Sequence, residues 1–120
     1  MTDKTYPSFQ IIEFMGNSSV LGRNCGSEVS LDKIFTQIVR QDFIRLKHDS
    51  LRMTETMLAE DIVIELKGIQ VASRDLAALP TGYTAQLELC GAGIDKLFSF
   101  REILSDDSYL AIESPCYARS

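Results

Sequence analysis

The stretch YTAQLEL, residues 83–89, decides the fold class. Its apolar residues Ala85, Leu87 and Leu89 alternate with polar ones, as expected of a β-strand with one face in the core and the other in water. A turn signal, Leu-Pro-Thr-Gly at 79–82, precedes this strand, and the glycines of Gly-Ala-Gly follow it. The sequence therefore predicts a strand with a turn at each end.

Further strand signals flank this segment. Residues 61–72 form a second apolar segment whose phase breaks around Gly68, which predicts a long strand with a bulge. Residues 9–14 and 20–23, on either side of a Gly-Asn-Ser-Ser turn, predict a β-hairpin, and residues 28–31 begin another strand. Short strands joined by regular turns indicate a sandwich or a barrel.

Two central segments are less specific. The apolar residues of 31–39 fit either an amphipathic helix or a strand over 33–39; the strand is favoured and the helix stays open. Residues 40–60 are charge-rich and predict a loop or short-helix excursion, with 51–59 as its helical candidate.

The C-terminal part predicts a short helix or turn over 94–104 and a final strand over 109–112, and Pro115 ends regular structure. Residues 1–120 are long enough for one domain with a real core. The expected fold is mainly β: a closed or nearly closed antiparallel β-barrel, with a charged insertion that has room for a short helix.

Composition excludes several classes of protein. The chain is 45% hydrophobic and 24% charged, which is ordinary for a globular domain. Its formal net charge of −5 opposes binding of nucleic acid through a general cationic field and suits a solubilising role or a basic partner. No run approaches the roughly twenty apolar residues of a membrane span, and no secretory signal is evident, so the expected location is the cytoplasm.

The three cysteines, Cys25, Cys90 and Cys116, form no C-x-x-C pair and are odd in number, which predicts neither a disulfide framework nor a zinc site. A thiol catalyst would need an activating base, and His48 is the one histidine. The simpler interpretation is a packed Cys90, plain thiols at the other two positions and a solvated His48. We therefore expect no enzyme.

The carboxylate pairs Glu60–Asp61 and Asp106–Asp107 could hold a cation in principle, but adjacent side chains diverge, so no metal site is predicted. The Gly-Ala-Gly turn at 91–93 lacks the third glycine of a dinucleotide fingerprint, and no phosphate loop exists. We expect no cofactor.

A basic patch is conceivable around Phe43, but interleaved acidic residues dilute it and favour a solvated face. Its members would be Arg40, Arg45, Lys47 and Arg52.

A set of short sequence motifs resembles the second domain of translational GTPases of the elongation factor Tu type. They are Phe9-Gln-Ile-Ile, Val20-Leu-Gly-Arg23, Gly26-x-x-Val29, Ile69-Gln-Val71, Leu79-Pro-Thr-Gly82 and Ala85-x-Leu87-x-Leu89-x-Gly91. The resemblance covers about residues 9–104 and implies a closed antiparallel β-barrel standing alone, without a GTPase domain. Residues 40–60 have no counterpart in that pattern.

Two functions follow as expectations. The first is a non-catalytic protein-interaction module, such as an immunity-type inhibitor or an accessory subunit that meets a basic protein. The alternative is a translation-associated or RNA-binding module, which the resemblance favours and the net charge opposes. The sequence locates no binding residues and leaves the oligomeric state open.

Overall fold

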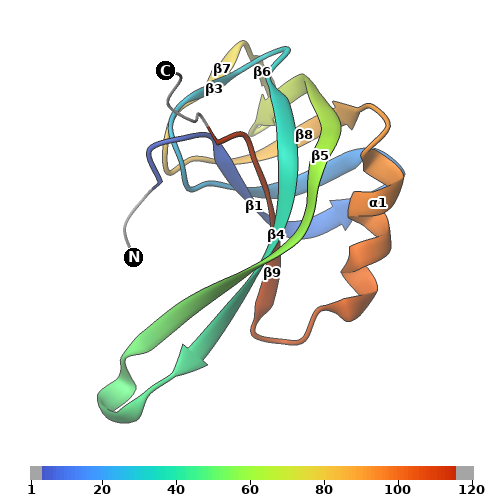
Figure 1. Cartoon of the computed structure of the whole chain (residues 1–120). Coiled ribbons are helices and arrows are strands. Elements are labelled where there is room, and N and C mark those ends of the chain that lie inside the picture. Colours follow the sequence, from blue (N-terminus) through green and yellow to red (C-terminus); the bar gives the residue numbers. More distant parts are fainter. Residues whose placement is uncertain (1–3, 116–120) are drawn as a thin grey trace, which may run out of the picture.

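Six antiparallel strands close a barrel in the computed structural model, which describes residues 4–115 (Figure 1). Around the barrel the order is β4-β9-β1-β2-β8-β5, and pairing of β5 with β4 closes the ring. The prediction of a closed antiparallel β-barrel is thus confirmed. The barrel strands are β1 (Ser8–Met15), β2 (Ser19–Asn24), β4 (Ile34–Arg45), β5 (Leu51–Val71), β8 (Thr84–Cys90) and β9 (Ser108–Glu113).

The other elements are short. β3 (Val29–Ser30) pairs with β7 (Ala78–Leu79), and β6 (Arg74–Leu76) pairs with the end of β5. Between β8 and β9 the chain forms α1 (Ile94–Ser99) and then the 3-10 helix η2 (Phe100–Ile103), which confirms the helical alternative for 94–104. Within the described part of the chain, no helix is both long and apolar enough to cross a membrane.

The core fills the inside of the barrel. Ala85, Leu87 and Leu89 of β8 are at most 2% exposed, which confirms the strand predicted from their alternation. Leu97 of α1 is fully buried and anchors that helix to the same core. Each large buried side chain contributes about 2 kcal/mol to folding. Other fully buried members are Phe9, Phe35, Ile38, Ile64, Leu66, Leu110 and Ile112.

Bulges and one glycine allow long strands to bend around the barrel. β5 shifts register between Leu66 and Gly68, where the sequence predicted a bulge, and β1 does so between Ile11 and Glu13. At Gly22 a Cβ atom would lie 2.0 Å from the carbonyl oxygen of Gln10. β1 and β2 can approach so closely only because this residue has no side chain.

The N-terminal and C-terminal strand predictions are also confirmed. β1 and β2 form the hairpin expected from 9–14 and 20–23, and β9 contains the strand expected at 109–112. The strand expected at 28–31 is shorter than predicted, since β3 ends at Ser30 and Leu31 lies outside it, 37% exposed.

A β-hairpin projects from the barrel in place of the predicted loop. β4 begins at Ile34, so the strand alternative for 31–39 is correct. β4 pairs with β9 only as far as Asp42; beyond that, residues 43–53, which we call the arm, extend away from the barrel (Figure 1).

The helical interpretation of 51–59 is wrong, because these residues pair antiparallel with β4. Leu51, Met53 and Met57 are separated by even numbers of positions and so share one face, a spacing that suits a strand. The short helix of this segment is instead η1 (Lys47–Asp49), a 3-10 turn at the tip of the arm.

Candidate protein-interaction site

A hollow of about 430 Å³ lies where the arm leaves the barrel. It is formed on the outer faces of β1, β4, β5 and β9 and by the loop before β9. Tyr109 faces outward here because its neighbour Leu110 points into the core. The hollow is lined by Gln10, Ile12, Phe43, Arg45, Leu51, Asp107 and Tyr109.

Two aromatic rings form one wall of this hollow. Phe43 and Tyr109 meet edge to face, with ring centroids 5.7 Å apart and an interplanar angle of 81°. The backbone N–H of Phe43 donates to the carbonyl oxygen of Asp107 (3.0 Å), which ties the arm to the loop before β9. An edge-to-face pair contributes about 1 kcal/mol beyond the area it buries, so the rings hold each other in place.

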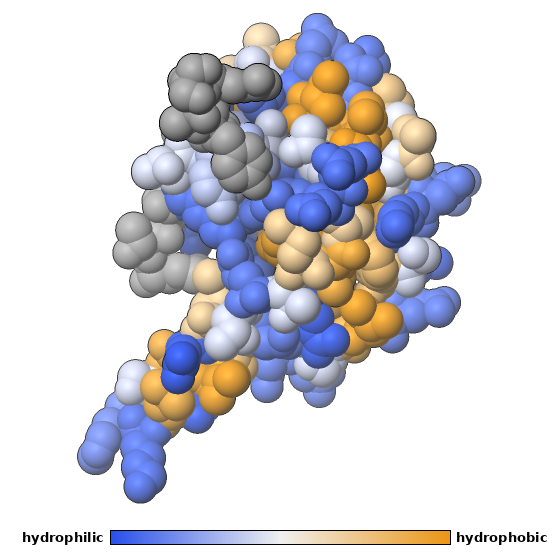
Figure 2. Space-filling model, viewed as in Figure 1, coloured by the Kyte–Doolittle hydropathy of each residue, from blue (hydrophilic) through white to orange (hydrophobic). Residues whose placement is uncertain are grey.

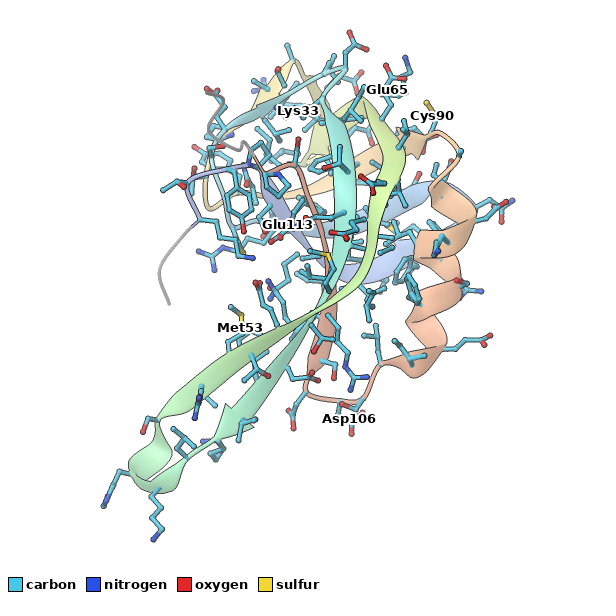
Figure 3. All side chains as sticks on the ribbon, viewed as in Figure 1. Lys33, Met53, Glu65, Cys90, Asp106 and Glu113 are labelled. Atoms are coloured by element: carbon cyan, nitrogen blue, oxygen red, sulfur yellow. The ribbon has the colours of Figure 1, made fainter. Side chains whose placement is uncertain are left out.

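Hydrophobic side chains around the hollow face the solvent. Ile12 is 53% exposed and Leu51 61% exposed, although both are large and aliphatic. Figure 2 shows a cluster of hydrophobic surface on the arm, and Figure 3 shows Met53 on the same element. Ile44, which is also exposed, lies on the opposite face of the arm from Phe43. A grouping of this kind marks an interaction surface more often than a single exposed leucine does.

A buried ionic network lies on the barrel wall beside the hollow. Glu113 of β9 is 1% exposed and accepts hydrogen bonds from Ser8 Oγ (2.7 Å) and Gln37 Nε2 (3.0 Å). Lys4 Nζ donates to Glu113 Oε2 and to Glu55 Oε2, so one ammonium joins β9 to β5. A buried carboxylate is tolerated only with such partners.

Two glutamines connect this network to the hollow. Gln41, which is 2% exposed, donates to Glu55 Oε2 (2.9 Å) and accepts from Gln10 Nε2 (2.8 Å). Gln10 itself lines the hollow. In the described residues no buried side-chain nitrogen or oxygen lacks a hydrogen-bond partner. The wall that supports the arm is therefore rigid and fully paired.

The charges of the network perturb its titratable groups. Burial, the largest effect, lowers the pKa of Lys4, but its hydrogen bonds to Glu113 and Glu55 and their negative charges together raise it above the ordinary value. The Lys4 ammonium also lies 5.5 Å from the centroid of the Tyr6 ring. Burial first, and then the negative charge of Glu113, raise the pKa of Tyr6.

A second polar cluster fixes the other side of the arm's base. Arg40 donates to Asp42 Oδ1 (3.0 Å), to the Ile103 carbonyl (3.1 Å) and to Ser108 Oγ (3.2 Å). Ser108 Oγ in turn donates to Asp42 Oδ1 (2.7 Å). This hydrogen bond, followed by that from Arg40, lowers the pKa of Asp42.

The structure does not bring the candidate thiols and the histidine together. His48 is at the tip of the arm, Cys25 follows β2, and Cys90 ends β8 with its sulfur 3.9 Å from Glu65 Oε1. Cys116 lies outside the described residues. Cys90 is one of the residues labelled in Figure 3, on the barrel away from the arm.

The carboxylate pairs are separate and exposed. Glu60 and Asp61 lie on β5, whereas Asp106 and Asp107 precede β9, and of these only Asp107 lines the hollow. Among residues 4–115 no three His, Cys, Asp or Glu side chains are grouped in a way that could hold a metal ion.

The four basic candidates do not share one surface. Arg40 is engaged at the base of the arm, and Lys47 lies at its tip. Arg45 is opposite Leu51 and Arg52 is opposite Ile44, so their side chains point to different faces of the arm.

The Gly91-Ala92-Gly93 turn has a packing role. The N–H of Gly93 donates to the Val63 carbonyl (2.8 Å), and a Cβ atom at Gly91 would lie 2.6 Å from that oxygen. Gly91 also adopts a positive φ of 120°. These glycines let the chain pass close to β5 before α1 begins.

In comparisons with known proteins, the chain matches no protein-family model and no curated protein sequence.

Sequence reasoning missed most of the residues that form this site. Tyr109 could have been found, because alternation along 109–112 places it on the face opposite Leu110 and Ile112. Glu113 and Lys4 carry no such signal: they are 109 positions apart, and only closure of the barrel brings them into contact.

Proposed function

We propose that this protein is a non-catalytic binding module that takes a protein partner at the hollow and along the adjoining face of the arm. The observation that carries the proposal is the juxtaposition of exposed aliphatic side chains, Ile12 and Leu51, with the Phe43–Tyr109 pair. Aromatic residues, methionine and arginine are enriched at the centres of protein interfaces, and all of them occur on this surface.

The rigidity of the wall supports the same proposal. Because Gln41 and Glu113 are buried and fully paired, the arm is held before any partner arrives, and less conformational entropy is lost on binding. The net charge of −5 favours a basic partner, whose approach it would accelerate. An immunity-type inhibitor or an accessory subunit fits these properties.

The translation-associated or RNA-binding alternative, with its resemblance to the elongation factor barrel domain, rests on the barrel alone. Arg45 and Arg52 point to different faces of the arm, so these two residues do not form a continuous basic surface that would support it. We keep it as an outcome of the test below.

The test compares two serine variants of nearly equal exposure. Ile12→Ser removes a side chain of the hollow that is 53% exposed, and Val63→Ser removes one on β5 that is 48% exposed and outside the lining of the hollow. Proteins retained from cell extract by the wild type are identified, purified and titrated calorimetrically against each variant. We expect Ile12→Ser to weaken binding by about 1–2 kcal/mol and Val63→Ser to leave it unchanged.

Equal affinities for Ile12→Ser and Val63→Ser would refute the hollow as the binding site. Retention of RNA alone, lost on nuclease treatment, would refute the protein-binding function and favour the alternative.

A further inference from the structure

The outer edge of β5 carries a row of backbone groups without a neighbouring strand. β8 covers this edge from Glu65 onward, but no described residue forms a strand along it between Leu51 and Met57. Over this stretch β5 therefore pairs on one side only, with β4. An open edge is a template for another strand.

The groups that face this edge follow from the pairing with β4. The N–H of Leu46 donates to the carbonyl of Ser50 (2.7 Å), and hydrogen-bonded pairs alternate along an antiparallel ladder. Arg52 and Thr54 therefore direct their N–H and C=O groups toward β4. The alternate residues direct their N–H and C=O groups toward the open edge. These are Leu51, Met53, Glu55 and Met57.

We propose that this edge pairs antiparallel with the same edge of a second copy of the chain, with Thr54 on the two-fold axis. In this register Met53 faces Glu55 of the second copy, and Leu51 faces Met57 of the second copy. The symmetry repeats each contact, giving roughly eight backbone hydrogen bonds. The two arms then form one continuous four-stranded sheet.

Side-chain complementarity selects this register. Leu51 and Met57 are 61% and 45% exposed. Pairing Leu51 of one copy with Met57 of the other covers both hydrophobic side chains, and the two-fold axis makes this pair occur twice in the dimer. Arg52 then faces Thr56, so no like charges are opposed. Moving the axis to Glu55 or to Arg52 would place identical charges opposite each other, and moving it to Met53 would shorten the overlap.

The inference goes beyond the proposed function and does not depend on it. Self-pairing uses backbone groups on the edge of β5, whereas the hollow is lined by side chains of β1, β4 and β9, with Leu51 as the one residue common to both. The two can therefore fail separately.

Disulfide trapping tests the register directly, in a background with Cys25→Ser, Cys90→Ser and Cys116→Ser. Thr54→Cys places two thiols opposite each other in a non-hydrogen-bonded pair, where the Cα atoms are about 4.5 Å apart and a disulfide can form. Thr56→Cys is the matched control, since its two copies would be about 13 Å apart. We expect covalent dimers from Thr54→Cys alone, and from Arg52→Cys mixed with Thr56→Cys, under mild oxidation.

Sedimentation of the wild-type chain should give twice its mass of 13.4 kDa at high micromolar concentration. Met53→Pro removes an outward N–H without breaking the pairing to β4, and should weaken the dimer on the order of 10-fold to 100-fold. Ile12→Ser should dimerise normally even where partner binding is lost. A wild type that stays monomeric, or a Thr56→Cys variant that cross-links with itself as fast as Thr54→Cys, would overturn the inference.

Discussion

Replacing Lys4 by methionine tests whether the buried network on the barrel wall stabilises the fold. Lys4 is 16% exposed and contacts two carboxylates, one of which, Glu113, is 1% exposed. Methionine keeps the length of the side chain but leaves the Glu113 charge buried without its cation. Removing one member of a buried ion pair costs about 3 kcal/mol, and the remaining bonds from Ser8 and Gln37 offset only part of that cost.

Urea denaturation measures the effect. A loss of about 3 kcal/mol, with a slope near 1.5 kcal/mol per molar urea, lowers the midpoint by about 2 M. The matched control is Lys67→Met: Lys67 also forms ion pairs, but it is 47% exposed, and we expect no measurable change. The double variant with Lys4→Met and Glu113→Gln should recover part of the loss, because no uncompensated charge then remains buried.

The pH dependence gives a second measurement on the same variant. The pKa of Lys4 is raised by folding, so its contribution is fully present below the ordinary value of 10.5 and is lost as pH rises through the higher folded value. Wild-type stability should therefore fall above pH 10.5 more steeply than that of Lys4→Met. Equal losses for Lys4→Met and Lys67→Met at neutral pH would refute this reasoning.

Three further results are expected. Gly22→Ala forces a Cβ atom to 2.0 Å from the Gln10 carbonyl oxygen and should destabilise the protein by about 3 kcal/mol in urea titration, whereas Gly16→Ala, at a φ of 63° with nothing within 4 Å, should cost about 1 kcal/mol. Replacing 43–53 by Asn-Gly should preserve the far-ultraviolet circular dichroism of the barrel and abolish both dimerisation and partner binding; loss of folding would mean that the arm is part of the core. The lowered pKa of Asp42 contributes stability that is present above its ordinary value of 3.8 and lost as pH falls through the lower folded value, so Asp42→Asn should flatten the acid limb of the stability curve, and an unchanged limb would contradict this.

The sequence predicted the barrel because its signal is local. Alternation at Ala85, Leu87 and Leu89 reports which face is buried, and Gly68 marks the bulge of β5, so both could be recognised without knowledge of the partner strands. The arm was misjudged for the opposite reason. Residues 51–59 are mostly exposed, so their strand identity comes from pairing with β4 and not from burial.

The site was less predictable than the fold. Lys4, Glu55 and Glu113 are ordinary charged residues in sequence, and each would be interpreted as solvated. Their role depends on closure of the barrel, which places β9 and β5 on the two sides of β4, with Lys4 reaching Glu113 on the one and Glu55 on the other. Phe43 was noted only as part of a basic patch, whereas its structural partner is Tyr109, 66 positions further along the chain.

The position of Glu55 connects the stability of the barrel with the proposed binding surfaces. Its side chain holds Lys4 and Gln41 on the barrel wall, while its backbone faces the open edge of β5. A perturbation of the network should therefore loosen the base of the arm before it unfolds the core, because the core residues Ile38 and Ile112 lie on the other face of the same strands. If so, Lys4→Met should weaken both dimerisation and partner binding at temperatures where the barrel remains folded, a coupling that neither surface would show if the arm were held by its own strand pairing alone.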